Sequence, residues 1–359
     1  MKGGQDSMKV YIARIKKILP PSYDLDYISE KIYPKELAGE KITKLVKKFA
    51  KNMHIKQKPT AIDLDSIPEI KLKRKEDHPK EWGKRVVKEL SEKIGIENIG
   101  FLSVAYNVTY NKDFLPNLTS QIVMETGLKT DIPPEELAYY GCAAGVISLK
   151  NAAEFCKKFN KAAISFTFDQ CSNIASFIYD PKNPMFKEAI KSNLLFSDGG
   201  VGILLIPESM KSKFDHPLIE LIEFKIDHVP GNTIRMENGV FVLENSLKDE
   251  IPPIVSEKVI KPILSEKDIP LSDIKEWALH QGGPAILEEF KKPEILGLSE
   301  EQLSTSYEMF NIYGNMSAPS CLLVLDKYFS NKENKSGTKG MIVGFGAGYY
   351  MASALYKWE

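Results

Sequence analysis

The segment Tyr140–Gly145 constrains the fold more than any other part of the chain, because it places a cysteine among residues almost too small to pack around it. An apolar stretch, Leu137–Tyr140, precedes the segment, and a helical pattern of apolar residues runs from Val146 to Phe155. Residues 162–168 then predict a strand. The order of these patterns predicts an α/β chain with Cys142 at a turn between a strand and a helix.

The position of Cys142 at a predicted helix start has a chemical consequence. The unpaired backbone N–H groups and the helix dipole favour an anion there, so we expect this thiol to ionise more readily than a free one. The small neighbours leave room for a substrate carbonyl beside the sulfur, which is typical of a nucleophile. A buried structural cysteine is the alternative that this segment alone leaves open.

The composition excludes several classes of function. Lysine plus arginine equals aspartate plus glutamate at 48 each, so no overall field attracts nucleic acid or an anionic membrane. Residues 1–7 are polar, and no apolar run approaches the roughly 18 residues that span a bilayer. The five histidines show no ligand spacing, so we expect no metal site. The four cysteines form no CxxC pair and indicate free thiols in a reducing, cytoplasmic setting: Cys142, Cys156, Cys171 and Cys321.

The chain shows an internal repeat. The alternation of predicted strands and helices starts again near Pro207, and Gly314–Ala318 opens a predicted helix as Gly141–Ala144 does in the first half. We therefore expect two α/β halves, residues 1–207 and 208–359. A site at their junction would follow, since ligand sites are common between such units.

Three polar residues stand in glycine-rich turns, namely Cys142, His280 and Asn315. Each has a simple structural explanation when taken alone. A histidine before Gly-Gly hydrogen-bonds a loop, and an asparagine after glycine is a common turn or N-cap residue. Their joint occurrence favours a functional interpretation.

These residues lie in three of five motifs that follow one another along nearly the whole chain. By these motifs and their order, the chain resembles the condensing enzymes of the thiolase superfamily, in particular the ketoacyl synthase III and type III polyketide synthase (chalcone-synthase-like) branch. His-x-Gly-Gly-Pro and Tyr-Gly-Asn-Met-Ser are typical of the polyketide synthase side. The motifs are Gly141–Gly145, Leu195–Gly200, His280–Pro284, Tyr313–Ser317 and Gly344–Gly348.

The resemblance implies a five-layered αβαβα fold built from two duplicated halves, a homodimer, and catalysis without a cofactor. It implies that Cys142 takes an acyl group from an acyl-CoA or an acyl carrier protein. His280 and Asn315 would polarise the carbonyl of a malonyl-type thioester such as malonyl-CoA, so that loss of CO₂ leaves an enolate. The enolate would attack the Cys142-bound acyl group in a decarboxylative Claisen condensation.

The same resemblance assigns further residues. Backbone N–H groups of Cys142, Gly346 and Ala347 are expected to form an oxyanion hole for the acyl carbonyl. Phe196 matches an aromatic gate of the substrate pocket, whereas polar residues near Glu244 replace the second gate. The predicted pocket residues are Phe196, Gln170, Ser172 and Gly283.

Three lysines share one face of a helix predicted over residues 37–53. They are Lys44, Lys47 and Lys51. The spacing alone is that of a solvated basic face, whereas the resemblance implies binding of the coenzyme A phosphates.

Two alternatives to a malonyl-dependent condensing enzyme stay open at this point. One is a ketosynthase that joins two acyl or β-ketoacyl thioesters to a pyrone or diketide. The other is a non-catalytic partner subunit that keeps the fold. A reaction like that of hydroxymethylglutaryl-CoA synthase would require an acidic base near the cysteine, and the sequence places none there.

Overall fold

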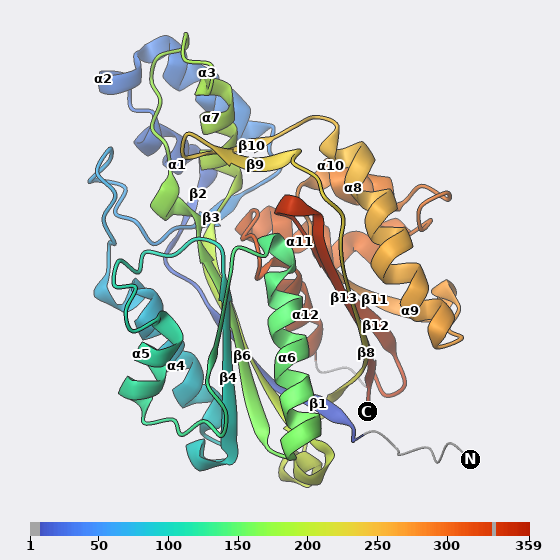
Figure 1. Ribbon diagram of the computed structural model, residues 1–359. Coiled ribbons are helices and arrows are strands. Elements are labelled where there is room, and N and C mark those ends of the chain that lie inside the picture. Colours follow the sequence, from blue (N-terminus) through green and yellow to red (C-terminus); the bar gives the residue numbers. More distant parts are fainter. Residues whose placement is uncertain (1–7, 332–334) are drawn as a thin grey trace.

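A computed structural model describes residues 8–331 and 335–359 of the chain (Figure 1). In this part of the chain, nine strands form one sheet, in the order β11-β12-β13-β8-β1-β7-β6-β4-β5. The strands of the first half are β1 (Val10–Ile18), β4 (Ile99–Tyr106), β5 (Glu135–Ala138), β6 (Ala162–Gln170) and β7 (Asp198–Pro207). Those of the second half are β8 (Ile219–His228), β11 (Ile274–Leu279), β12 (Lys339–Phe345) and β13 (Tyr350–Trp358).

The sheet repeats one pairing pattern outward from its middle, where β1 and β8 pair antiparallel. In the first half β1 pairs antiparallel with β7, β7 antiparallel with β6, and β6 parallel with β4. In the second half β8, β13, β12 and β11 follow with the same three directions. β5 extends the first half parallel to β4, and the described residues contain no counterpart of it beyond β11.

Two helices, α6 (Ala144–Phe159) and α12 (Ser320–Ser330), lie between the two halves of the sheet (Figure 1). They pack with inward-facing strand residues such as Ile203 and Leu205 in one core, whereas Leu204 and Ile206 face a second, outer core. This alternation follows from the two-residue period of a strand. Helices α4 (Pro79–Ser91) and α5 (Leu118–Thr126) cover the first half on the outside.

The outer face of the second half has its own core under several helices. They are α8 (Leu247–Val255), α9 (Lys261–Glu266), α10 (Pro284–Phe290) and α11 (Glu300–Tyr313). A π-helical turn, Ser256–Ile260, joins α8 to α9. The chain is thus layered as helix, sheet, helix, sheet, helix, as expected from the resemblance. The boundary between residues 207 and 208 stays a prediction, although β7 ends at Pro207.

A smaller lobe packs on α7 (Phe186–Leu195) around a fourth core. It consists of α1 (Leu25–Ile32), α2 (Lys35–Ala38), α3 (Glu40–Lys51), β2 (Ser22–Asp24) and β3 (Gln57–Pro59). The single helix predicted over residues 37–53 is wrong in one respect, since Gly39 with a φ of 80° separates α2 from α3. A hairpin of β9 (Ile234–Glu237) and β10 (Val240–Leu243) lies beside this lobe (Figure 1). In the ranges that the structure covers, no helix combines the length and the apolar character required to cross a bilayer.

The two halves meet in a contact between backbones. A Cβ atom on Gly346 would lie 2.4 Å from the backbone nitrogen of Cys142, and one on Gly141 would lie 2.8 Å from that of Ala347. A Cβ atom on Gly344 would lie 2.8 Å from the carbonyl oxygen of Cys142. The end of β12 and the loop after it therefore reach the cysteine turn only because all three of these positions lack side chains.

We expect Gly346→Ala to lower the free energy of unfolding by about 1–3 kcal/mol, the usual cost of overpacking. Gly346 has an extended φ of −172°, so the cost would come from the added methyl group and not from the backbone conformation. Urea unfolding followed by circular dichroism measures the change. Gly283→Ala is the matched control, because its φ of 168° is also extended and no atom lies within 4 Å of its Cβ position. Equal losses in both variants would contradict a tight contact at Gly346.

Candidate active site

Two of the three residues singled out in the sequence lie in loops that follow parallel strands, where ligand sites of α/β sheets are common. Cys142 lies in a 3₁₀ turn, Gly141–Ala143, between β5 and α6. His280 directly follows β11, and Asn315 lies between α11 and α12. The second helix was expected to open at Gly314–Ala318, but α12 begins only at Ser320, and an extra turn holds Asn315.

A path of hydrogen bonds joins the three loops. The Asn315 side-chain amide donates to the carbonyl oxygen of Gly282 at 3.1 Å, two residues after His280. Its side-chain oxygen accepts from the backbone N–H of Ser317 at 2.8 Å. The Ser317 hydroxyl lies 3.4 Å from the Cys142 sulfur. The structure thus joins Cys142, Asn315 and the loop that follows His280 by hydrogen bonds, although they are far apart in the sequence, whereas the His280 side chain itself is not part of this path.

The thiol of Cys142 differs from the expectation. Burial raises its pKa to about 12, the carboxylate of Asp169 acts in the same direction, and the Ser317 hydroxyl partly opposes them. The expected easier ionisation is therefore wrong for the protein without substrate. The sequence argument considered the helix start but not the loss of water around the sulfur or the neighbouring negative charge.

His280 is buried and neutral. Its side chain is 3% exposed, its Nδ1 atom has no hydrogen-bond partner, and burial lowers its pKa to about 3. The edge of the ring packs against Phe345 at 5.2 Å between centroids. A neutral imidazole in such a place can donate one hydrogen bond without carrying charge.

One member of the predicted oxyanion hole is engaged elsewhere. The backbone N–H of Gly346 donates to the carbonyl oxygen of Tyr350 at 3.0 Å, so it is not free to bind an acyl oxygen. The backbone nitrogens of Cys142 and Ala347 lie on the two sides of the close glycine contact. Of the predicted oxyanion-hole donors, we therefore retain the backbone N–H groups of Cys142 and Ala347.

The predicted pocket residues fall in three places. Gly283 lines a pocket of about 400 Å³ beside Gly282 and Leu243. Phe196 and Ser172 line a small enclosed cavity under the N-terminal lobe. Gln170 has another position, since its amide donates to Asp77 O at 2.7 Å and accepts from Tyr110 N at 2.9 Å. We therefore assign Gln170 to the scaffold of the site.

The gate at Phe196 is also different from the expectation. Glu244 is polar as predicted and pairs with Arg235 at 2.5 Å. However, Phe241 on β10 packs against the Phe196 ring at 4.6 Å between centroids. An aromatic partner is thus present, and it comes from an earlier residue than the one at which the sequence comparison placed the gate.

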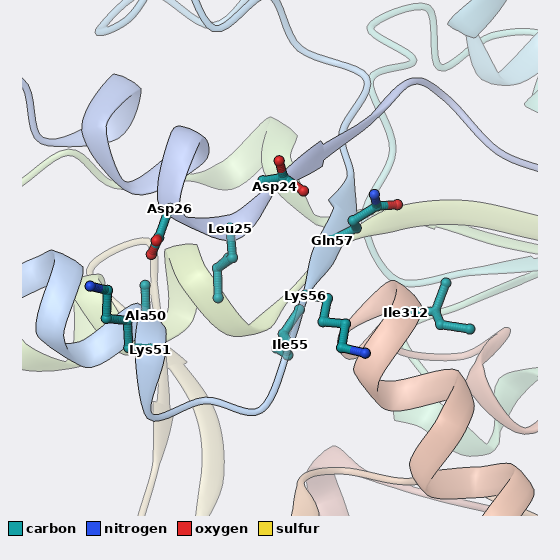
Figure 2. A pocket seen from close by; sticks show the side chains of 9 residues that line it. All are labelled: Asp24, Leu25, Asp26, Ala50, Lys51, Ile55, Lys56, Gln57 and Ile312. Atoms are coloured by element: carbon teal, nitrogen blue, oxygen red, sulfur yellow. The ribbon is translucent and has the colours of Figure 1, made fainter.

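Two of the three predicted phosphate-binding lysines have carboxylate partners within the protein. Lys44 pairs with Glu40 at 2.6 Å, and Lys47 pairs with Glu30. Lys51 has no ion pair among the described residues. It lines a pocket of about 540 Å³ between α1, the end of α3, β3 and α11, together with Lys56 (Figure 2).

Residues that the sequence argument did not assign complete the cluster. Asn107, after β4, donates from its side-chain amide to the Ser317 hydroxyl at 3.3 Å, and Asp169, near the end of β6, accepts from the backbone N–H of Ala318 at 3.0 Å. Ser317 belongs to the motif Tyr313–Ser317, but the motif alone did not show its positive φ of 61°, with which its side chain lies toward Cys142. No group of three or more His, Cys, Asp or Glu side chains in the described ranges is placed to hold a metal ion.

Comparisons with known proteins agree with this geometry. Residues 264–358 match the family model described as 3-oxoacyl-[acyl-carrier-protein (ACP)] synthase III C terminal. A putative chalcone synthase of Bacillus subtilis (strain 168) is 27% identical over 236 residues, which cover 61% of this chain and 60% of that protein. The match thus spans less than two thirds of this curated relative.

Solved structures extend the likeness to the whole fold. PKS-I from the brown alga Ectocarpus siliculosus superposes with a TM-score of 0.78 at 18% identity, over 99% of this chain and 100% of that one. The C-terminal type III polyketide synthase domain of Steely1, a type I/III hybrid from Dictyostelium, gives 0.72 at 17% identity, over 97% and 99%. The chain has the fold of these two polyketide synthases, and the sequence matches above agree with the resemblance to the ketoacyl synthase III and type III polyketide synthase branch.

The buried imidazole predicts a pH dependence of stability. Because the pKa of His280 is about 3 in the folded protein and near 6.5 when unfolded, its contribution is complete above pH 6.5 and declines as the pH falls toward 3. His280→Gln should therefore lose less stability than the wild type between pH 6.5 and 4.5, by up to about 1.4 kcal/mol per pH unit.

Urea unfolding of both proteins at the two pH values measures this difference. Asp169, whose pKa burial raises to about 6, acts in the opposite direction but is present in both proteins, so its effect cancels. His216→Gln is the control, since His216 lies at an exposed position where its ring contacts the Pro217 carbonyl. An equal acid loss in wild type and His280→Gln would contradict a buried neutral His280.

Proposed function

We propose that the protein is an acyltransferase that catalyses a decarboxylative Claisen condensation between a Cys142-bound acyl group and a malonyl-type thioester. The observation that carries the proposal is the hydrogen-bonded cluster that unites Cys142, Asn315 and the loop of His280 at the junction of two repeated halves. The relatives named above, a putative chalcone synthase and two polyketide synthases, support the same reaction class.

The chemistry requires the residue types found here. A thiolate is both a good nucleophile and a good leaving group, which suits a sulfur that must take up and release an acyl group. Decarboxylation leaves an enolate oxygen, and a neutral imidazole and an amide can each donate a hydrogen bond to it. One such donor contributes about 3 kcal/mol in a site that excludes water. The low pKa of His280, about 3, keeps the imidazole neutral throughout the physiological range.

The substrates that fit are acyl-CoA, malonyl-CoA or acyl carrier protein thioesters, and the reaction needs no bound cofactor. The pocket beside Gly282 and Gly283 gives access to the loop of His280. Lys191, Lys248 and Glu244 line this pocket, and Lys191 also pairs with Glu188 at 3.8 Å. A thioester arm that enters here would pass the glycines before it reaches the cluster.

We also propose a cytoplasmic homodimer. The four cysteines are unpaired in the structure, as expected of a reducing compartment. Several large apolar side chains near the β5 edge are strongly exposed, and such patches commonly mark protein interfaces. They are Phe114, Leu115, Met124 and Tyr139, which are 75%, 91%, 71% and 75% exposed.

Asn315→Asp separates the two half-reactions. The carboxylate cannot donate to the enolate and repels its charge, so malonyl-CoA decarboxylation should fall by about 100-fold or more. Acylation of Cys142 by an acyl-CoA should persist, as a mass shift on the peptide that contains Cys142.

Product analysis and peptide mass spectrometry report the two steps. Cys142→Ala is the control and should carry no acyl group. Equal loss of both steps in Asn315→Asp would contradict the division of roles, and acylation of Cys156 or Cys171 in place of Cys142 would contradict the nucleophile.

The lysines can be distinguished by charge reversal. Lys51→Glu should raise KM for an acyl-CoA by about 10-fold, whereas KM for the corresponding acyl-pantetheine, which lacks the nucleotide phosphates, should change little. Lys44→Glu is the matched control on the same helix, because Lys44 is already paired with Glu40. Steady-state kinetics with both substrates measures these KM values. A similar effect of both variants would contradict a specific role of Lys51 and indicate an ordinary solvated lysine.

A further inference from the structure

The N-terminal lobe carries a local excess of positive charge, although the charges of the whole chain balance. Residues 35–56, which contain α2 and α3, include seven lysines and only two acidic residues. Figure 1 shows that this lobe forms one end of the molecule, opposite the end at which β1 begins and β13 ends. A flat surface that approaches this end of the molecule therefore contacts the lobe and not the sheet.

Two lysines of α3 have no partner within the described part of the protein. Lys41 and Lys48 form no ion pair there, in contrast to their neighbours Lys44 and Lys47, which are paired with glutamates. Both unpaired lysines are exposed. Their spacing of seven residues is two helical turns, so they lie on one side of the helix. Their charges are therefore free for an anionic partner outside the protein.

Apolar side chains are exposed on the same two helices. Leu45 and Phe49 are 42% and 40% exposed, and Leu37 on α2 is 50% exposed. Leu45 and Phe49 are one helical turn apart, so they form an apolar stripe along α3. The buried residues of α3 are Val46 and Ala50, so the stripe lies outside the core of the lobe.

The apolar stripe leads toward the entrance proposed for the substrate. Met53 lies four residues beyond Phe49, just after the end of α3, and it lines the pocket of about 400 Å³ that also contains Gly282 and Gly283. The residues on either side of Met53 line the same pocket. A surface that binds the stripe would thus lie next to this pocket.

Exposed apolar residues beside unpaired lysines fit the headgroup region of an anionic lipid bilayer. The apolar side chains of a surface helix enter the boundary between headgroups and acyl chains, and lysines beside them attract anionic headgroups. The long stem of a lysine lets its ammonium reach the headgroups while its methylene groups stay with the apolar stripe. An acidic protein would match the lysines alone, whereas a bilayer matches the lysines and the stripe together.

We propose that α3 docks on a membrane that contains anionic phospholipids, through a docking face formed by Lys41, Leu45, Lys48 and Phe49. Docking through this face brings the pocket that Met53 lines to the bilayer surface. In the condensing enzyme of the proposed function, an acyl thioester whose chain lies in the bilayer would then enter the pocket from the membrane. The docking itself requires no turnover, so it is tested separately from the proposed function.

Sedimentation of the full chain with lipid vesicles tests the docking. Vesicles of phosphatidylcholine and phosphatidylglycerol are compared with vesicles of phosphatidylcholine alone, at low and at high salt. We expect the protein to bind the anionic vesicles and not the neutral ones, because the lysines attract anionic headgroups. High salt should release it, because salt screens this attraction.

A matched pair of variants locates the docking face. Lys48→Ala/Phe49→Ser should lower the partition coefficient for anionic vesicles about 30-fold, since it removes one charge and one apolar anchor. Lys158→Ala/Phe159→Ser is the control, because the same dipeptide stands at the end of α6 that is distant from the lobe (Figure 1), with Phe159 39% exposed. The control should bind as the wild type does. Circular dichroism shows whether both variants are folded.

A second variant tests the charges without a change in packing. Lys41→Glu/Lys48→Glu alters only exposed, unpaired side chains, and it should abolish binding to the anionic vesicles. Equal binding of Lys48→Ala/Phe49→Ser and its control would overturn the proposal. Equal binding to neutral and anionic vesicles, or no binding to either, would overturn it as well.

Two further outcomes separate this proposal from its alternatives. If the wild type binds no vesicles and Lys41→Glu/Lys48→Glu raises KM for an acyl carrier protein thioester, the docking face belongs to a carrier protein and the proposal is overturned. The proposed function fails by a different measurement, the absence of an acyl group on Cys142 after incubation with acyl-CoA. Binding to anionic vesicles through the docking face by such a protein would sustain the docking and reject the condensation.

Discussion

The site depends on the contact between the backbone at Gly141–Cys142 and the loop that follows β12. At this contact two loops from different halves approach so closely that a single methyl group on Gly346 would collide with the Cys142 backbone nitrogen. Neither half alone contains the cluster, because Cys142 comes from one half and His280, Asn315 and Ser317 come from the other. Each half therefore supplies one loop to this contact.

Much of the architecture could be predicted because it follows from local patterns. The strand predicted over residues 162–168 is β6, and it is fully buried, as expected of a strand between layers of helices. The helical pattern from Val146 to Phe155 lies within α6, as predicted. The break at Gly39 was missed because the lysines on both sides continue a helical pattern.

The site was predicted less completely, for a physical reason. Residue type and spacing identified Cys142, His280 and Asn315, but the ionisation of a buried group depends on atoms that are distant in the sequence. Asp169 lies 27 positions from Cys142 and raises the pKa of its thiol, and no local pattern could have shown this. The same holds for Gly346, whose N–H is engaged by Tyr350 across a turn. The sequence therefore indicated which residues lie together, and the contacts in the folded protein determine their protonation and their hydrogen bonds.

The high pKa of the Cys142 thiol affects how readily this residue reacts with oxidants and electrophiles when no substrate is bound. Oxidants, heavy metals and electrophiles attack thiolates, and a thiol that keeps its proton near neutral pH reacts slowly with all of them. The burial of the sulfur and the carboxylate beside it, which both raise the pKa of the thiol, would thus slow the oxidation of Cys142 to a sulfenic acid. In the proposed condensing enzyme, this cysteine would therefore rest in its protonated form while no acyl donor is bound.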